Sequence, residues 1–270
     1  MKKGIDVSQW QGEISWQRVK EWGAEFALIR AGYGRFAHQE DRQFKKNIAG
    51  AAAAGIPAGV YWYSYAVTEE EAEEEAETCL SVIGAYRDRI SLPVFFDQEY
   101  EPGITALKSR ARTDICLAFL ERIRAEGYRA GLYCSLDWWE NRLERERLAG
   151  WPLWIARYGG EHGCDSADLV LWQYSSQGEA DGIAGKVDLN EGYDGLFPAD
   201  GWLQAGGDWY YLRGGRYLRE SWVEDGGWRY RLGGDGRMVT GWVHADGKLW
   251  WCNEKRTYGV PKGACIGEVS

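Results

Sequence analysis

Two acidic residues follow a short apolar run in the first half of the chain. Asp97 and Glu99 lie in "FFDQEY", residues 95 to 100, which continues the apolar segment that begins at Leu92. Because side chains alternate along a strand, residues two apart point to one side, and Gln98 points to the other. Two carboxylates on one face repel each other, and burial adds to the cost of charging them. Such a pair indicates acid/base chemistry or a metal site.

The histidines help to decide between these two chemistries. His38, His162 and His244 lie far apart in the sequence, which argues against a transition-metal site. Magnesium-assisted chemistry stays open, although no Gly-rich phosphate loop accompanies the two acids. Acid/base chemistry is therefore the favoured interpretation, and we expect neither a metal ion nor an organic cofactor.

Two further acids lie in short strand-like segments, Asp6 in "GIDVS" and Asp188 in "KVDLN". A lone Asp at a strand end often caps a helix or belongs to a turn, and this alternative remains open for both residues. If the strands close into a barrel, however, the first and last strands are neighbours. All four carboxylates would then gather in one mouth of the barrel.

The elements that must position these acids alternate between strand and helix over the first 196 residues. The predicted strands cover residues 4–8, 26–32, 58–64, 92–99, 129–135, 152–158, 169–175 and 186–190. The predicted helices cover residues 14–23, 39–54, 68–86, 107–127 and 137–149. Alternating apolar strands and helices predict an α/β fold with a parallel sheet that is covered on both faces. Eight strands predict a closed barrel, with its chemistry at the C-terminal ends of the strands.

Paired carboxylates suit glycoside hydrolysis. One acid protonates the leaving oxygen, and another carboxylate stabilises the positive charge that develops on the sugar. Sugar binding also needs exposed aromatic faces, and many aromatic residues lie near the predicted strand ends, about half of which we assign to the core. The candidates for substrate contact are Tyr33, Tyr61, Tyr63, Trp172 and Tyr174.

Composition excludes some classes of partner. The 270-residue chain has a net charge of −9, so it has no electrostatic attraction to nucleic acid or to an anionic membrane. No apolar run approaches the ~20 residues that span a bilayer. The start, "MKKGIDVSQW", lacks the apolar segment of a secretory leader, so we expect a chain that begins in the cytoplasm or one whose leader has been removed.

Most of the six cysteines are expected to be buried thiols, and Cys252 with Cys265 is the one pairing to test.

Aromatic usage changes near residue 200. Seven of the 16 tryptophans lie in the last 70 residues, and Trp202, Trp222 and Trp242 recur at a spacing of 20. A Gly-rich turn and an apolar or aromatic cluster follow each of them, which predicts a short array of β-hairpins. We therefore expect a first domain at 1–196, a linker at 197–200 and a small all-β module at 201–270.

The first domain resembles glycoside hydrolase family 25, the bacterial and phage lysozymes that act as N-acetylmuramidases. The motifs that carry the resemblance run in order from residue 4 to about 196: "GIDVSQWQG", "RAGYG", "GIPAGVYWYS", "PVFFDQE", "GLYCS", "LWIARY", "LWQYSSQG" and "GKVDLN". The resemblance implies an irregular, TIM-like β/α barrel with eight strands and about five helices, in agreement with the count above.

The resemblance also implies roles for the four acids. Glu99 would be the general acid, and Asp97 would orient the substrate N-acetyl group as an internal nucleophile in a substrate-assisted, retaining reaction. Asp6 and Asp188 would tune the pKa values and hold the sugar. The implied activity is hydrolysis of the β-1,4 bond between N-acetylmuramic acid and N-acetylglucosamine in bacterial peptidoglycan. A different N-acetylhexosaminide hydrolase and a non-catalytic wall-binding protein remain alternatives.

The C-terminal hairpins resemble choline-binding or cell-wall-binding repeats, with departures at Ser221, at Leu249 and in the last stretch, "GVPKGACIGEVS". The resemblance implies that aromatic side chains bind choline or another wall polymer, and the alternative is that they only form the core of small hairpins. The aromatic candidates are Trp202, Trp209, Tyr211, Trp222, Trp228, Tyr230 and Trp242.

A wall-acting enzyme without a leader suits a phage endolysin that stays cytoplasmic until release, and a secreted autolysin that has lost its leader is the alternative.

Overall fold

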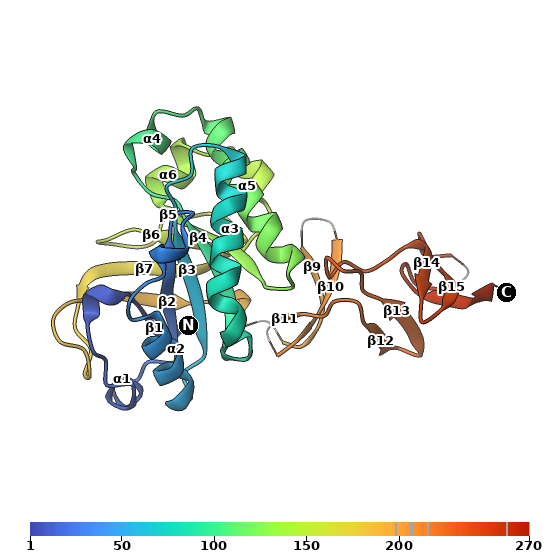
Figure 1. Cartoon of the computed structure of the whole chain (residues 1–270), viewed down its shortest axis with the longest axis horizontal. Helices are drawn as coiled ribbons and strands as arrows, with labels where there is room; N and C mark the ends of the chain where they lie inside the picture. Colours follow the sequence, from blue (N-terminus) through green and yellow to red (C-terminus); the bar gives the residue numbers. More distant parts are fainter. Residues whose placement is uncertain (198, 206–207, 215, 258, 270) are drawn as a thin grey trace. The chain divides into compact units, whose positions relative to one another are not determined.

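A computed structural model describes the chain except for residues 198, 206–207, 215, 258 and 270 (Figure 1). The chain divides into two compact units. The first comprises Met1–Ile123 with Arg129–Pro198, and the second comprises Arg124–Tyr128 with Ala199–Ser270. No helix in the described part of the chain is both long and apolar enough to cross a membrane.

The first unit is a closed barrel in which each strand pairs with the next along the chain, and β8 pairs with β1. Strands β1 to β7 are parallel, whereas β8 runs antiparallel to both β7 and β1. The barrel prediction is confirmed, but the expectation of a wholly parallel sheet is wrong, because the connection at 179–186 is too short for a crossover helix. The eight strands are β1 (Lys2–Val7), β2 (Phe26–Tyr33), β3 (Ala58–Tyr63), β4 (Ile90–Asp97), β5 (Ala130–Ser135), β6 (Leu153–Ala156), β7 (Leu169–Gly178) and β8 (Val187–Gly192).

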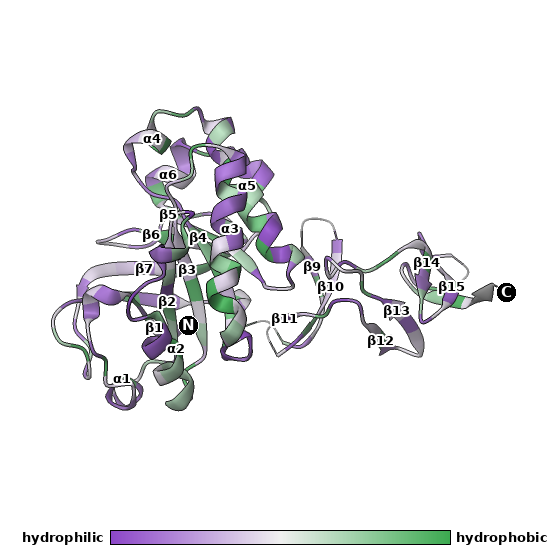
Figure 2. Cartoon of the chain, in the orientation of Figure 1, coloured by the Kyte–Doolittle hydropathy of each residue, from purple (hydrophilic) through white to green (hydrophobic). Residues whose placement is uncertain are grey.

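Helices between the first six strands lie on the outside of the barrel (Figure 1). They are α1 (Trp16–Trp22), α2 (Phe44–Ala53), α3 (Glu69–Ile83), the short α4 (Pro102–Thr105), α5 (Ser109–Ala125) and α6 (Leu136–Asn141). The predicted cap of α3 is confirmed, because the Thr68 side chain accepts the Glu71 amide over 3.2 Å. Hydrophilic residues predominate along this helix, while the barrel strands range from hydrophobic stretches to the pale hydrophilic shade of β7 (Figure 2).

The predicted helix at 137–149 is wrong in length. Helix α6 ends at Asn141, and a separate 3-10 turn covers Arg145–Leu148. Between them, the Arg112 guanidinium donates to the Arg142 carbonyl over 3.0 Å. The Glu144 amide donates to the Thr113 hydroxyl over 2.9 Å. These tertiary hydrogen bonds use backbone groups that a continuous helix would have paired within itself.

Large side chains fill the barrel below its mouth. The Trp154 ring lies 4.5 Å from the Tyr133 ring and 5.3 Å from the Phe95 ring, measured between centroids. These packed aromatic groups form a solid floor, which leaves only the C-terminal ends of the parallel strands open for chemistry. The buried cluster comprises Phe26, Leu28, Leu92, Phe95, Tyr133, Trp154, Val170, Leu171 and Leu196.

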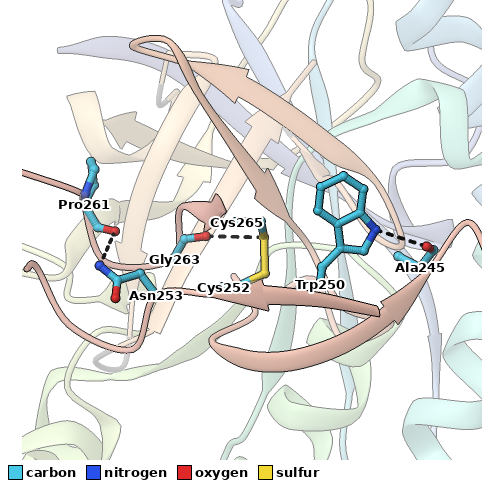
Figure 3. Close-up of a disulfide and its surroundings, with 7 residues drawn as sticks. All are labelled: Ala245, Trp250, Cys252, Asn253, Pro261, Gly263 and Cys265. Carbon is cyan, nitrogen blue, oxygen red and sulfur yellow. Dashed lines mark hydrogen bonds between the residues drawn. A yellow bond between two sulfur atoms is a disulfide. The ribbon is translucent and has the colours of Figure 1, made fainter. Parts of the chain in front are cut away.

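Among the described residues of the second unit, the strands form three small antiparallel sheets, which confirms the predicted hairpins. Their strands are β9 (Gly201–Ala205), β10 (Asp208–Arg213), β11 (Arg216–Tyr217), β12 (Trp222–Asp225), β13 (Trp228–Arg231), β14 (Gly241–Ala245), β15 (Lys248–Cys252) and β16 (Cys265–Val269). A disulfide joins Cys252 in β15 to Cys265 in β16, so the proposed pairing is confirmed (Figure 3). The other four cysteines are free and buried, as expected.

Candidate active site

The four predicted acids lie on three strands of the barrel and the loop after one of them. Asp97 is the last residue of β4, and Glu99 follows two residues later, outside the strand. Asp6 lies in β1, directly opposite Asp188 in the antiparallel pairing with β8. Because β8 is reversed, the beginning of this strand, and not its end, brings Asp188 to the mouth. The structure therefore brings all four carboxylates to the mouth of the barrel. Asp188 reaches the mouth at the start of an antiparallel strand, whereas a parallel barrel would place it at the end of a strand.

Asp6 and Asp188 form a coupled pair of acids. The amide nitrogens of Gln173 and Asn190 both donate to Asp6 Oδ2, over 2.9 and 2.8 Å. Burial and the Asp188 charge nevertheless raise the pKa of Asp6 well above its ordinary value. A hydrogen bond between the two carboxyls also raises the pKa of Asp6, and it lowers that of Asp188 against the effect of burial. Asp6 therefore holds the shared proton, and Oδ1 is the oxygen left to carry it.

A network of neutral groups fixes this pair. The Tyr158 hydroxyl donates to Gln173 Oε1 over 2.8 Å, and the Tyr133 hydroxyl, 2.9 Å from the same oxygen, has one proton to donate either there or to Glu99. The Trp154 indole donates to Asn190 Oδ1 over 2.9 Å. With each amide oxygen occupied by a donor, the NH₂ groups of Gln173 and Asn190 must face Asp6. The sequence did not identify these residues, and their one signal is a polar residue within an apolar strand.

Asp97 is a buried acid with an unsatisfied oxygen. Its side chain is 4% exposed, and its Oδ1 has no hydrogen-bond partner among the described residues. Burial raises the pKa of Asp97, followed by the charges of Glu99 and Asp6, while the Arg30 charge lowers it. The main-chain carbonyl of Asp97 accepts the Ser64 amide over 3.0 Å, which fixes the residue against the loop after β3. A buried carboxylate oxygen without a donor is available to a substrate group.

Glu99 is half-buried and lies closer to solvent than Asp97. Burial raises its pKa, and the charges of Glu101 and Asp188 add to the shift, whereas a hydrogen bond with Tyr133 opposes it. Glu101 in turn accepts the Tyr63 hydroxyl over 2.6 Å. A carboxyl with a raised pKa stays protonated closer to neutral pH, which is the state that a general acid requires.

Gln98 confirms the predicted alternation of side chains. It is fully buried, and its Oε1 accepts the Trp138 indole of α6 over 2.9 Å. Its amide nitrogen donates to the Arg112 carbonyl in α5 over 3.4 Å. This residue thus anchors the segment to the helices on the outer side of the sheet. Asp97 and Glu99, on either side of it, face the mouth of the barrel.

Three of the five predicted sugar-contacting aromatics lie near the acids. Burial raises the pKa of Tyr61, and the charges of Asp6 and Asp97 add to the shift, so this hydroxyl faces the acids. The rings of Tyr63 and Tyr33 lie 5.3 and 6.2 Å from the ring of Tyr65, which is 47% exposed. Tyr65 was not among the five predicted residues, and it extends this row toward solvent.

The other two predicted aromatics lie elsewhere. Gln173 points toward Asp6, so Trp172 and Tyr174, on either side of it in β7, point away from the carboxylates. The Trp172 ring lies 5.6 Å from that of Tyr174 and 5.8 Å from that of His162. The structure does not bring these two aromatics to the four acids, because the side chains of adjacent residues in a strand point to opposite faces of the sheet.

The aromatic residues of the second unit form two different clusters. In the first, the Trp202 ring lies 5.2 Å from Tyr211, 6.5 Å from Trp209 and 4.8 Å from Tyr230. The Trp202 indole also donates to Asp225 over 3.1 Å. Three aromatic rings therefore contact the Trp202 ring itself. Trp228 and Met238 pack in the same cluster.

The second cluster repeats this geometry with different residues. The Trp222 indole donates to Asp246 over 2.7 Å, and its ring lies 4.9 Å from that of Trp250. Its cross-strand partner is Arg231, at the position that Tyr211 occupies opposite Trp202. The Arg229 guanidinium lies 4.4 Å from the Trp222 ring and 5.4 Å from the Trp250 ring. An arginine of the chain itself thus occupies the position of a bound cation.

Trp242 ends the series in a third environment. It is 55% exposed, and its ring lies 5.1 Å from that of Trp251. The three tryptophans of the 20-residue period therefore have three different sets of neighbours, and the Trp202 ring contacts three other aromatic rings.

A closed barrel with buried, coupled carboxylates at its mouth defines a glycoside hydrolase site. A family model, glycosyl hydrolases family 25, matches residues 5–183, which include Asp6, Asp97 and Glu99 but end before Asp188. The chain belongs to this family. Its family is one of glycosyl hydrolases, and the relatives that it resembles include proteins named as lysozymes.

Individual relatives support the same assignment. Lysozyme M1 of Streptomyces globisporus is 29% identical over 201 residues, covering 70% of this chain and 67% of the relative. The autolytic lysozyme of Clostridium acetobutylicum is 28% identical over 194 residues, covering 72% of this chain and 56% of the relative. The modular autolysin LytC of Streptococcus pneumoniae is similar in structure, with a TM-score of 0.63 and 27% identity over 70% of this chain and 46% of LytC. The match thus spans between about half and two thirds of these proteins.

Proposed function

We propose that the chain hydrolyses the β-1,4 bond between N-acetylmuramic acid and N-acetylglucosamine in bacterial peptidoglycan. The observation that carries this proposal is the pair Asp97 and Glu99 at the mouth of the barrel, where burial raises both pKa values. The names of the relatives support it, because Lysozyme M1 and the autolytic lysozyme are lysozymes. LytC has also been solved in complex with a synthetic peptidoglycan ligand.

In the proposed reaction, Glu99 donates its proton to the glycosidic oxygen as the bond to the anomeric carbon breaks. The acetamido oxygen of the same sugar attacks that carbon and forms a cyclic oxazolinium ion. Asp97 accepts a hydrogen bond from the acetamido N–H, for which its unpaired Oδ1 is free. Glu99, now a carboxylate, takes a proton from water, and the resulting hydroxide opens the ring and restores the N-acetyl group with retained configuration.

The other residues set the protonation states for this reaction. The positive charge of Arg30 favours the ionised form of Asp97 and opposes the larger effect of burial. The proposed reaction requires Asp97 ionised and the proton on Glu99. Asp6 and Asp188 form the negative wall beside the sugar and share a proton of their own. Because all four acids interact, their titration belongs to the group as a whole.

The experiment that tests this activity is lysis of purified bacterial walls, with identification of the sugar at each new reducing end. A muramidase leaves N-acetylmuramic acid there. A different hexosaminide hydrolase leaves N-acetylglucosamine, and a wall-binding protein without activity leaves no new ends. The first result supports the proposal, and either of the others refutes it.

We further propose that the chain is organised as a catalytic domain at 1–196, a linker at 197–200 and a wall-binding module at 201–270. The 20-residue period and the three small sheets support this division. The proposed place of action is the cell wall, where peptidoglycan lies. Release as a phage endolysin and secretion as an autolysin are both compatible with that role.

For the module we propose a quaternary ammonium ligand, such as choline on a wall polymer, at the Trp202 cluster. Aromatic faces attract such cations without any need for bulk charge. The Trp222 cluster already contains Arg229, so this proposal assigns the module one principal site and not an array. Retention of the full chain on choline resin is the test. If the chain binds to walls but not to choline resin, the module binds the wall through a ligand other than choline. If it binds to neither, the hairpins have only a structural role.

A further inference from the structure

A cavity of about 250 Å³ lies between the loops that follow β2 and β3 and the first turns of α3. Both loops leave the C-terminal ends of parallel strands, which is the end that carries Asp97 and Glu99. Phe36 from the first loop and Tyr65 from the second line the cavity, and they are 52% and 47% exposed. The cavity therefore opens between two aromatic side chains on the same side of the barrel as the acids.

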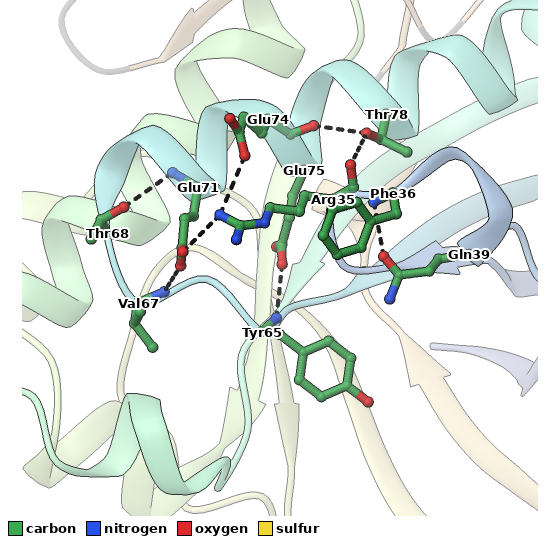
Figure 4. Close-up of polar contacts among 10 residues, drawn as sticks. All are labelled: Arg35, Phe36, Gln39, Tyr65, Val67, Thr68, Glu71, Glu74, Glu75 and Thr78. Atoms are coloured by element: carbon green, nitrogen blue, oxygen red, sulfur yellow. Dashed lines mark hydrogen bonds and ion pairs between the residues drawn. The ribbon is translucent and has the colours of Figure 1, made fainter.

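Glu75 of α3 lines this cavity with an unsatisfied oxygen. The residue is only 1% exposed, and its Oε1 accepts the Tyr65 amide over 2.8 Å (Figure 4). Its Oε2 is buried and has no hydrogen-bond partner among the described residues. Burial raises the pKa of Glu75 to about 7, while hydrogen bonds from the Tyr65 amide and the Ser64 hydroxyl oppose the shift and the Glu71 charge adds to it. Buried polar atoms are rarely left unpaired, so a ligand group is the natural partner for Oε2.

Gln39 provides a donor in the same cavity. Its Oε1 accepts the Phe36 amide over 2.8 Å, which fixes the orientation of its side-chain amide (Figure 4). The remaining group, Nε2, donates to no atom among the residues that the structure describes. The cavity thus presents one carboxyl oxygen and one N–H donor that are both without a partner.

Arg35 does not make the cavity an anion site. Its guanidinium Nη1 lies 2.7 Å from Glu71 Oε1 and 3.4 Å from Glu74 Oε2 (Figure 4). Two carboxylates therefore neutralise the one cation that lines the cavity. What remains available is a matched acceptor and donor between aromatic walls.

The cavity is closely connected to the acids. Tyr65 packs against Tyr63 at 5.3 Å, and the Tyr63 hydroxyl donates to Glu101, whose charge raises the pKa of Glu99. Between these tyrosines, the Ser64 amide donates to the Asp97 carbonyl over 3.0 Å. Direct contacts therefore join the wall of the cavity to the segment that carries Asp97 and Glu99.

We propose that this cavity is a subsite for a secondary amide of the polymeric substrate, with its N–H donating to the ionised carboxylate of Glu75 and its carbonyl accepting from Gln39. The apolar side of the ligand group packs against Tyr65. Because the volume lies below the roughly 300–1,000 Å³ of pockets for whole small ligands, the cavity takes one group of a longer chain. This proposal rests on the function proposed above. Two parts of peptidoglycan carry the required amide, the N-acetyl group of a distal sugar and the stem peptide.

The test measures kcat and KM of the full chain for three soluble glycan chains of equal length. One is N-acetylated and free of peptide, one has its distal sugar de-N-acetylated, and one carries stem peptides. The variants are Glu75→Gln, which keeps the acceptor for the Tyr65 amide but offers a donor to the ligand, and Gln39→Ala. Glu73→Gln, an exposed position on the same helix, is the matched control.

We expect both cavity variants to raise KM about tenfold with kcat unchanged, because each removes one hydrogen bond to the substrate. A rise that requires the distal acetyl group assigns the cavity to that sugar, and a rise only with peptide-bearing chains assigns it to the stem peptide. An unchanged KM for all three chains overturns the proposal, provided that wild type cleaves them. If wild type cleaves none of them, the proposed muramidase activity itself is wrong.

Discussion

Asp6 and Asp188 lie directly opposite each other in the antiparallel pairing of β1 and β8, and a hydrogen bond joins their carboxyl groups. The two carboxyl groups at the edge of the site therefore share one proton. Because the Asp188 charge also raises the pKa of Glu99, this pair influences the acid that the proposed reaction uses first.

Replacement of Glu99 by Gln should lower the rate of wall lysis by about 10²–10⁴-fold, because the near-isosteric amide has no proton to transfer. Thermal unfolding should be little changed. The exposed Glu73→Gln variant, with wild-type activity, is the control for loss of a carboxylate as such. If Glu99→Gln keeps more than roughly a tenth of the wild-type rate, Glu99 is not the general acid.

Replacement of Asp97 by Asn should also reduce activity strongly, because an amide cannot orient the acetamido N–H as a carboxylate does. The companion measurement uses wild type and a synthetic glycoside that lacks the N-acetyl group. Substrate assistance predicts poor turnover of that compound. Equal turnover of acetylated and non-acetylated substrates would instead favour an ordinary carboxylate nucleophile.

The pH profile of activity should be bell-shaped, with an optimum on the mildly acidic to neutral side. The proposed reaction needs Glu99 protonated and Asp97 ionised at the same pH, and the acids of the site titrate together. Activity falls on the alkaline side as Glu99 loses its proton. The hydrogen bond with Tyr133 lowers the pKa of Glu99, so Tyr133→Phe should move the alkaline limb of kcat/KM to higher pH. Tyr158→Phe, which also removes a hydroxyl from Gln173, is the control. An alkaline limb that moves to lower pH would contradict the assignment.

Glu75 should make stability depend on pH. Burial raises its folded-state pKa to about 7 from its ordinary value of 4.5, so the folded protein holds this proton more tightly than the unfolded chain. Stability from this residue is complete below about pH 4.5 and is lost as pH rises to about 7, by on the order of 3 kcal/mol. Glu75→Gln should therefore be more stable than wild type at pH 8 and similar at pH 4.5, in urea unfolding. An equal effect at both pH values would rule out this titration.

Removal of the internal cation should open a second site in the C-terminal unit. The variant carries Arg229→Gln together with Arg231→Gln, and calorimetry measures the stoichiometry of choline binding to the full chain. We expect one principal site in wild type and two in the variant, because the Trp222 ring is no longer occupied. Trp202→Ala should remove the wild-type site. A stoichiometry that does not change in the double variant would show that Arg229 is not an internal ligand.

The sequence by itself determined the local part of the site. An alternation of two residues placed Asp97 and Glu99 on one face and Gln98 on the other, and the hydrogen bonds of Gln98 to α5 and α6 confirm it. The eight strand segments and the hairpin period were also evident. Each of these features depends on residue types at short, regular spacing.

Only the tertiary structure decided which residues meet across strands. The reversal of β8 placed Asp188 opposite Asp6, and strand register brought Gln173 and Asn190 to the same carboxylate. The same register directed Trp172 away from the acids. Register joins segments more than 160 residues apart in the chain, as in the hydrogen bond from Gln173 to Asp6. A one-residue shift in register moves every side chain of a strand to the other face, so the pattern within a single strand cannot define these contacts.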